Sequence, residues 1–96
     1  MNAEEAYHRV RQYISRTDSR FDNWYCGVTE DIERRLYIAH NVPKDGHPAV
    51  YAECTTNAQA REAASGLCLD GCKGSSVKDQ DAIFVYAYKI SGQTRQ

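Results

Sequence analysis

The sequence predicts one small α/β domain in which helices and strands alternate. Three segments repeat apolar residues with the spacing of an amphipathic helix, and three others show the alternation or the β-branched and aromatic content of a strand. The chain has 96 residues, which is long enough for one hydrophobic core but not for two. The predicted order is helix, strand, helix, strand, helix, strand, in a single domain that covers residues 1–96.

The first predicted helix lies within residues 1–16. Asn2 is in position to cap it, and Glu5 can reach back to complete a capping box. The apolar positions recur three and four residues apart, at Ala3, Ala6, Tyr7, Val10, Tyr13 and Ile14. Polar residues interrupt this pattern over 17–23, which predicts a loop.

Residues 23–28 alternate and predict the first strand. Successive side chains of a strand point to opposite faces of the sheet. One face therefore carries Trp24, Cys26 and Val28, and the other carries Tyr25 and Gly27. One of these faces belongs to the core, and Tyr25 is expected on the face away from Trp24.

The second predicted helix follows this strand directly and ends near His40. Thr29 is its predicted N-cap, and acidic residues in its first turn suit the positive end of the helix dipole. Its buried stripe consists of Ile32, Leu36 and Ala39. On a wheel of about 100° per residue, Arg35 lies at the rim of that stripe, whereas Arg34 faces solvent.

The second half of the chain repeats the pattern. A strand is predicted over 48–54, and a helix opens at Thr56–Asn57. The apolar face of that helix is formed by Ala60, Ala63, Ala64 and Leu67. Residues 70–80, rich in Gly, Ser, Lys and Asp, predict a mobile loop, and 82–90 predicts the third strand. The tail 91–96 is expected to be disordered.

Residues 24–40 carry the main functional motif. A Tyr25-x-Gly27 turn ends the first strand, and Arg35 and His40 follow in the next helix. This layout resembles the second motif and first helix of the GIY-YIG nuclease superfamily. It is most similar to short stand-alone bacterial members, in which Trp-Tyr-x-Gly-x-Thr-x-Asp leads into Glu-Arg-Arg-Leu and then His-Asn. The resemblance implies a compact three-stranded antiparallel sheet flanked by helices.

The resemblance also implies a metal-assisted site for phosphodiester cleavage, with Tyr25, Arg35 and His40 around the phosphate. The superfamily opens with a Gly-Ile-Tyr strand, which is missing upstream of the first strand here. The C-terminal strand is expected to fill that place in a permuted sheet, so that Tyr86 or Tyr88 supplies the absent catalytic tyrosine. The alternative is that both tyrosines only pack on the core.

The metal ligand is the weakest part of this match. The superfamily has a glutamate that binds one divalent ion, Mg²⁺ or Mn²⁺, and the resemblance places Ala64 at that position. Alanine offers no oxygen to a hard cation. Glu53 and Glu62 are the remaining candidates, but Glu62 differs from Ala64 by about 200° around the helix. The cleavage site is therefore expected to be incomplete.

The sequence allows two hypotheses about function. One hypothesis is a nuclease-like protein that binds or acts on nucleic acid, and the other is an interaction or regulatory module that keeps only the scaffold. Twelve basic and thirteen acidic residues give a net charge of −1, so nucleic-acid contact requires a local patch. Arg35 and the arginines of the first helix, Arg9, Arg11 and Arg16, are its predicted members.

Localisation is predicted from the absence of hydrophobic segments. No apolar run approaches the roughly 20 residues of a membrane span, and no secretory segment is seen at the N-terminus. A cytoplasmic protein with free thiols is expected, without a membrane partner. Cys68 and Cys72 resemble half of a zinc site, but the other two cysteines, Cys26 and Cys54, lie on strands and are expected to point inward.

Overall fold

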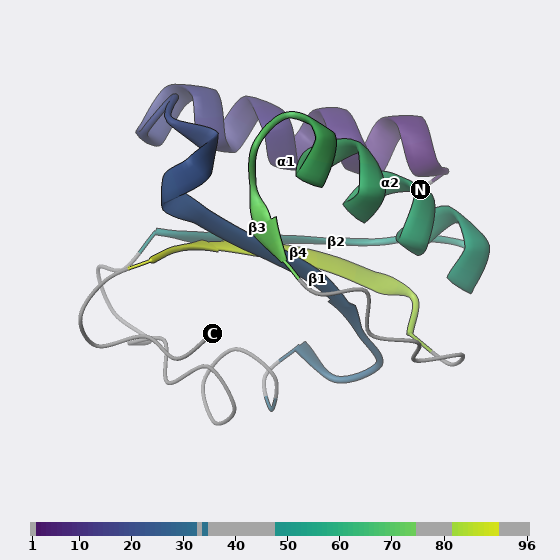
Figure 1. Cartoon of the computed structure of the whole chain (residues 1–96). Coiled ribbons are helices and arrows are strands. Elements are labelled where there is room, and N and C mark those ends of the chain that lie inside the picture. Colours follow the sequence, from purple (N-terminus) through teal and green to yellow (C-terminus); the bar gives the residue numbers. More distant parts are fainter. Residues whose placement is uncertain (1, 33, 35–47, 75–81, 91–96) are drawn as a thin grey trace.

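The computed structural model describes residues 2–32, 34, 48–74 and 82–90. That part of the chain forms a small α/β domain (Figure 1). Its elements are α1 (Ala3–Thr17), the short 3-10 helix η1 (Phe21–Asn23), β1 (Trp24–Thr29), β2 (Ala49–Glu53), α2 (Asn57–Leu69), β3 (Lys73–Gly74) and β4 (Phe84–Lys89). Neither α1 nor α2 has the length and hydropathy that a helix needs to cross a membrane.

The sheet has four strands in the order β2-β4-β1-β3 and is mixed. β4 runs antiparallel to both β1 and β2, whereas β3 runs parallel to β1. The expectation of a wholly antiparallel, three-stranded sheet is therefore wrong. The strand that was not predicted is β3, which is only two residues long and lies in the segment predicted to be a loop. Two residues are too few to show a strand periodicity.

The C-terminal strand pairs as predicted with the first strand. β4 lies between β1 and β2, and its register places Tyr86 opposite Gly27 and Tyr88 opposite Tyr25. The chain reaches this central position last, because β1 and β2 lie earlier in the sequence. The sheet is therefore completed by a contact between the two halves of the domain.

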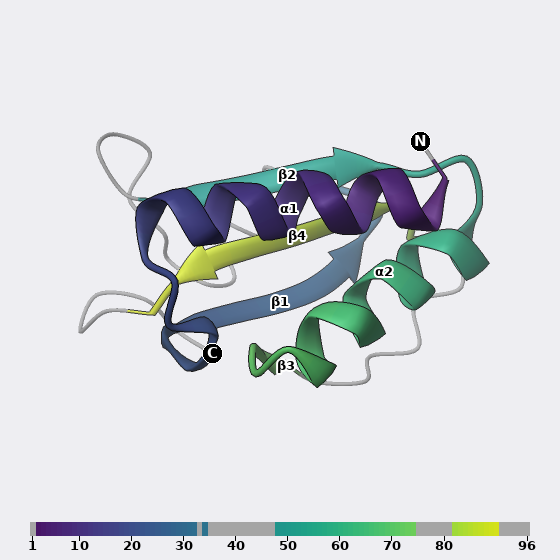
Figure 2. The ribbon, with the colours of Figure 1, turned by 90° about the horizontal axis from the view of Figure 1, so that it is seen from above.

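Both helices cover the same face of the sheet. α1 lies over β2 and β4, and α2 lies alongside β1 (Figure 2). The core between these layers contains the helix residues Ala6, Val10, Ile14, Ala60, Ala63 and Leu67 and the strand residues Trp24, Cys26, Val28, Ala52, Val85 and Ala87. The small alanines of α2 allow the helix to approach the strands closely.

Local capping explains where the helices begin. The Glu5 backbone N–H donates to Asn2 Oδ1 at 2.8 Å and the Asn2 N–H donates to Glu5 Oε1 at 3.1 Å, which confirms the capping box. The N-cap predicted at Thr29 is wrong. Asp31 Oδ1 accepts the Arg34 N–H at 3.1 Å, the bond that an N-cap makes, and the Thr29 hydroxyl accepts the Asp31 N–H instead.

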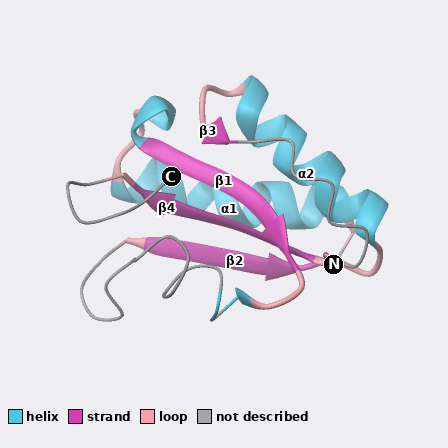
Figure 3. Cartoon of the chain, turned by 60° about the horizontal axis from the view of Figure 1, so that its bottom comes forward, coloured by secondary structure: helices cyan, strands magenta, loops and turns pink. Residues whose placement is uncertain are grey.

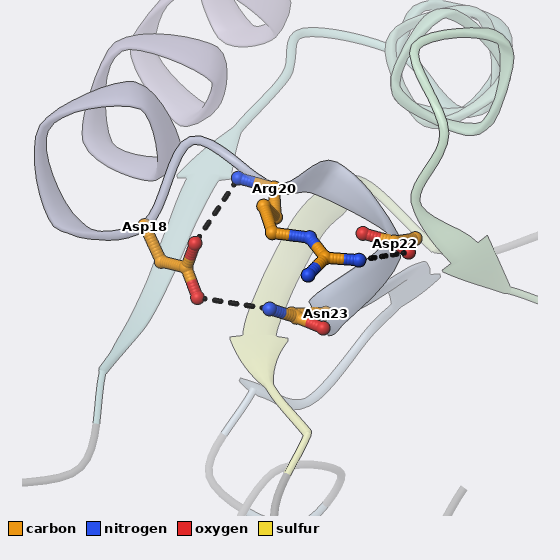
Figure 4. A network of polar contacts seen from close by, with 4 residues as sticks. All are labelled: Asp18, Arg20, Asp22 and Asn23. Atoms are coloured by element: carbon orange, nitrogen blue, oxygen red, sulfur yellow. Dashed lines mark hydrogen bonds and ion pairs between the residues drawn. The ribbon is translucent and has the colours of Figure 1, made fainter.

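A polar network fixes the connection from α1 to β1 (Figure 4). The Asp18 carboxylate accepts the Arg20 backbone N–H and the Asn23 side-chain amide, each at 3.1 Å. Lys89 Nζ, at the end of β4, lies 3.3 Å from the same carboxylate. Asp18 thus ties the end of the first helix to the loop before β1 and to the end of β4. The hydrogen bonds from Asn23 and Arg20 hold the pKa of Asp18 below its ordinary value.

The Asp18 network should make the free energy of unfolding depend on pH in the acid range. Because the Asp18 pKa is lowered in the fold, its contribution to stability is complete above the pKa of an unfolded aspartate. It is lost as the pH falls below about 4 through the folded pKa. We expect Asp18→Asn to unfold at a lower urea concentration than wild type at neutral pH and to show a smaller loss below pH 4.

The control is Asp22→Asn in the same loop. Asp22 is exposed and contacts Arg20 Nη2 at 3.3 Å, a surface pair that contributes little. Its urea midpoints should follow the wild-type curve at every pH. An acid response in Asp18→Asn as large as that of wild type would show that the carboxylate does not act in this way.

Candidate functional site

The sheet face away from the helices is lined with tyrosines. Figure 3 views the sheet from this side, with α1 behind the strands. Tyr86 and Tyr88 of β4 are buried at its centre, and they form a second apolar cluster, separate from the core under the helices. Partly buried residues packed against them are Tyr25, Ile32, Ala49 and Ile90. We call these six residues the tyrosine cluster.

The register of β1 and β4 sets the geometry of this cluster. The Tyr25 ring stacks on the Tyr88 ring, with centroids 5.4 Å apart and an angle of 27° between the planes. Two residues further along β1, the Tyr86 hydroxyl lies over Gly27. A Cβ atom at residue 27 would be only 2.8 Å from that oxygen. A glycine is needed at residue 27 because the tyrosine ring occupies the space of a side chain.

The cluster holds Tyr88 in its neutral form. Burial, and to a smaller extent the neighbouring Tyr25, raise the pKa of Tyr88 above its ordinary value. Tyr88 is completely buried. A neutral, enclosed phenol is suited to packing and hydrogen bonding rather than to proton removal. Both C-terminal tyrosines lie against the Tyr25-x-Gly27 motif, Tyr88 against Tyr25 and Tyr86 against Gly27.

The predicted motif residues are only partly described by the structure. Tyr25 lies on the face opposite to Trp24, as predicted, because Trp24 belongs to the core under the helices. Arg34 is exposed, as predicted. Arg35 and His40 lie outside the described residues. The nearest described neighbour on the predicted stripe is Ile32, which packs in the tyrosine cluster.

The structure does not bring the predicted metal positions together. Ala64 belongs to α2, which covers the other face of the sheet, and its carbonyl oxygen accepts the Cys26 thiol at 3.8 Å. The placement of Ala64 in one site with Tyr25 is therefore wrong, and Glu62, exposed on the same helix, lies on that other side too. The motif in the sequence does not specify which face of the sheet α2 covers, because that depends on how α2 packs.

Glu53 remains as the strand carboxylate. It ends β2, and alternation places it on the tyrosine face with Tyr51. In the register it stands opposite Phe84, two residues beyond the Tyr51–Tyr86 pair. Within the described residues, no group of three His, Cys, Asp or Glu side chains is arranged to hold a metal ion.

The predicted basic patch occupies a different surface. Arg9, Arg11 and Arg16 lie on α1, on the helix side of the sheet, and Arg11 Nε is 3.6 Å from Asp70 Oδ2. Arg11 also lies over the Phe21 ring, 5.9 Å from its centroid. Among the described residues, no carboxylate pairs with Arg9 or Arg16. The three arginines of α1 and Tyr25 thus lie on opposite faces of the sheet.

The four cysteines are all free thiols. Cys54 is buried, and the other three gather where α2 ends, with Cys26 Sγ 3.5 Å from Cys68 Sγ. The sequence indicated an inward-facing Cys26 and a Cys68-x-x-x-Cys72 pair but not their proximity. The signal that links them is the short β3, which brings residues 72–74 against β1.

Comparisons of the chain with protein-family models, with curated proteins and with solved structures gave no match. The class of protein that the described residues define is a small α/β domain with a four-stranded mixed sheet. Its two faces differ in chemistry, since helices cover one and tyrosines line the other.

Proposed function

We propose that this protein is a GIY-YIG-like domain that binds the phosphate backbone of nucleic acid and has an incomplete cleavage site. The observation that supports this proposal is the contact between Tyr86 and the Tyr25-x-Gly27 motif on adjacent antiparallel strands. In the superfamily, the motif strand is preceded by a Gly-Ile-Tyr strand. β4 would fill that place from the C-terminal end of the chain.

The proposed phosphate ligand is Arg35. Ile32 packs in the tyrosine cluster, and side chains three residues apart on a helix lie on the same side. A continued helix would therefore place Arg35 beside Tyr25. A guanidinium makes bidentate, charge-assisted contacts with phosphate and needs no metal for this. The Tyr25 hydroxyl, and His40 near the end of the helix predicted from the sequence, would add hydrogen bonds to the same group.

A second contact is available at the edge of the tyrosine face. Tyr51 of β2 is 50% exposed, a high value among the aromatic residues that the structure describes. Its ring meets the Phe84 ring edge-on, with centroids 6.1 Å apart. An exposed ring beside a phosphate site can stack on an unpaired base. The proposal therefore favours single-stranded nucleic acid over a duplex.

Arg35→Ala is expected to weaken binding of a labelled single-stranded oligonucleotide about 10- to 100-fold, because a charged hydrogen bond contributes about 1.5–3 kcal/mol. Fluorescence anisotropy at low salt measures this change. Affinity should also fall as salt rises, since phosphate contacts release counterions. The matched control is Arg34→Ala, which removes the same charge from an exposed position one residue away.

Equal losses of affinity in Arg35→Ala and Arg34→Ala would show that positive charge alone, rather than a specific site, binds the oligonucleotide. Wild-type protein should cleave the oligonucleotide at least about a thousandfold more slowly than a complete site would, even with Mg²⁺ or Mn²⁺. Robust metal-dependent cleavage that Arg35→Ala abolishes would contradict the incomplete site and would direct attention to Glu53.

The rival function is an interaction or regulatory module that keeps only the scaffold. The observation that favours it is the burial of Tyr86 and Tyr88, with 3% and 0% of their surfaces exposed. Such residues are typical of a core. Wild-type protein that binds neither DNA nor RNA at low salt would support this rival and would rule out the nucleic-acid proposal.

A further inference from the structure

Three thiols from separate parts of the fold meet beside β1. Cys26 belongs to β1, Cys68 lies in the last turn of α2, and Cys72 precedes β3. Cys26 Sγ lies 3.5 Å from Cys68 Sγ, and Cys72 is near enough to Cys26 for each of the two thiols to shift the pKa of the other. We call these three residues the thiol cluster.

The members of the thiol cluster differ in exposure and in acidity. Cys68 is exposed, whereas Cys26 and Cys72 are 1% and 6% exposed. The hydrogen bond from Cys26 lowers the pKa of Cys72. The same bond, together with burial, raises the pKa of Cys26. The proton is thus held on Cys26, and Cys72 is the more readily ionised of the two.

A close backbone approach keeps the cluster together. β3 pairs with β1, and Gly74 lies opposite Cys26. A Cβ atom at residue 74 would be 2.4 Å from the Cys26 carbonyl oxygen and 3.3 Å from Cys68 Sγ. A larger residue at position 74 would therefore push the segment away from β1. The glycine allows α2, β3 and β1 to meet at the thiols.

We propose that Cys26 and Cys68 form a reversible disulfide when the protein meets a low-molecular-weight disulfide such as oxidised glutathione. The two sulfurs already touch, and a bond of about 2.05 Å requires them to approach by about 1.5 Å more. Cys68 is exposed at the end of a helix, where a small movement disturbs little packing. The inference is independent of the proposed nucleic-acid function.

The disulfide forms in two thiol–disulfide exchange steps. The Cys68 thiolate attacks oxidised glutathione, forms a mixed disulfide and releases one glutathione thiolate, which takes up the proton that Cys68 lost. The Cys26 sulfur then attacks the Cys68 sulfur of the mixed disulfide. The second glutathione leaves as a thiolate and takes up the proton that Cys26 loses. Two protein thiols are oxidised, and one glutathione disulfide is reduced to two thiols.

The bond would connect α2 to the strand of the tyrosine face. Cys26 lies between Tyr25 and Gly27, although its side chain points to the opposite side of the sheet. A disulfide at Cys26 would therefore restrain the strand segment that carries both motif residues. The chemical class of the ligand at this site is a small thiol or disulfide.

The test uses the reduced full-length chain under native conditions. It is treated with oxidised glutathione, free thiols are alkylated, and intact and peptide masses are measured. Apart from the alkyl groups on the remaining thiols, wild type and the control Cys54→Ser should each lose the mass of two hydrogen atoms, with peptides linked through Cys26 and Cys68. Cys68→Ser should form no disulfide, and this exposed substitution should not affect folding. Cys26→Ser should retain one glutathione on Cys68, because no second thiol attacks it.

Three results would overturn the proposal. A wild-type chain that keeps glutathione on Cys68 would show that Cys26 does not complete the exchange. A disulfide that involves Cys72 would identify a different pair. An unchanged disulfide yield in Cys68→Ser, with far-ultraviolet circular dichroism matching wild type, would show that the exposed cysteine is not needed.

Discussion

Trp24→Ala is expected to lower the free energy of unfolding by about 3–5 kcal/mol, because it removes a large aromatic side chain from a closed core. Trp24 is completely buried. Its indole N–H donates to the Asp18 carbonyl oxygen at 3.0 Å, and its ring meets the Tyr13 ring edge-on, with centroids 5.9 Å apart. Since small domains are stable by only about 5–15 kcal/mol, much of the variant should be unfolded at 37 °C.

Urea denaturation followed by far-ultraviolet circular dichroism measures this loss, because tryptophan fluorescence disappears with the substitution. Leu69→Ala is the control, since Leu69 is 90% exposed and its truncation should change the free energy by less than about 0.5 kcal/mol. If the two variants had similar urea midpoints, the packing of α1 and α2 over β1 would be wrong.

Gly27→Ala is expected to destabilise the protein by about 1–3 kcal/mol through overpacking at the tyrosine cluster. The new Cβ atom would lie 2.8 Å from the Tyr86 hydroxyl oxygen and 3.0 Å from the ring carbon that bears it. Tyr86 is 3% exposed, so its ring has little room to move aside. The near-ultraviolet circular dichroism of the tyrosines should change with the displaced ring.

A double-mutant cycle isolates this contact. In a Tyr86→Ala background the ring is gone, so Gly27→Ala should have little effect or should stabilise slightly, because alanine restricts the unfolded chain more than glycine does. Equal destabilisation by Gly27→Ala in both backgrounds would show that the strain comes from the β1 backbone rather than from Tyr86. The register between β1 and β4 would then need revision.

The elements that the sequence predicted well are those set by local chemistry. The start of α1 follows from the Asn2 and Glu5 capping box, which is contained within four residues. The two faces of β1 follow from alternation, which placed Trp24 and Tyr25 on opposite sides. The same local reasoning failed by two residues at Thr29, because Asp31 offers an equally suitable capping oxygen.

The candidate site was predicted only in part. Tyr25, Gly27 and Tyr86 lie on adjacent strands, as predicted, but Ala64 and Glu62 are on the other side of the sheet. A motif match orders residues along the chain and does not specify which face of a sheet a later helix covers. That face is decided by which apolar surfaces pack together.

The sequence by itself therefore determined α1, α2, β1, β2 and β4, the capping of α1 and the outward side of Tyr25, since each depends on neighbours within a few residues. Only the tertiary structure decided that β4 lies at the centre of the sheet, that β3 joins it, and that Cys26 touches Cys68. These contacts join residues distant in sequence. They form because burying the apolar faces of α1, α2 and the strands together outweighs the entropy lost in closing the intervening loops.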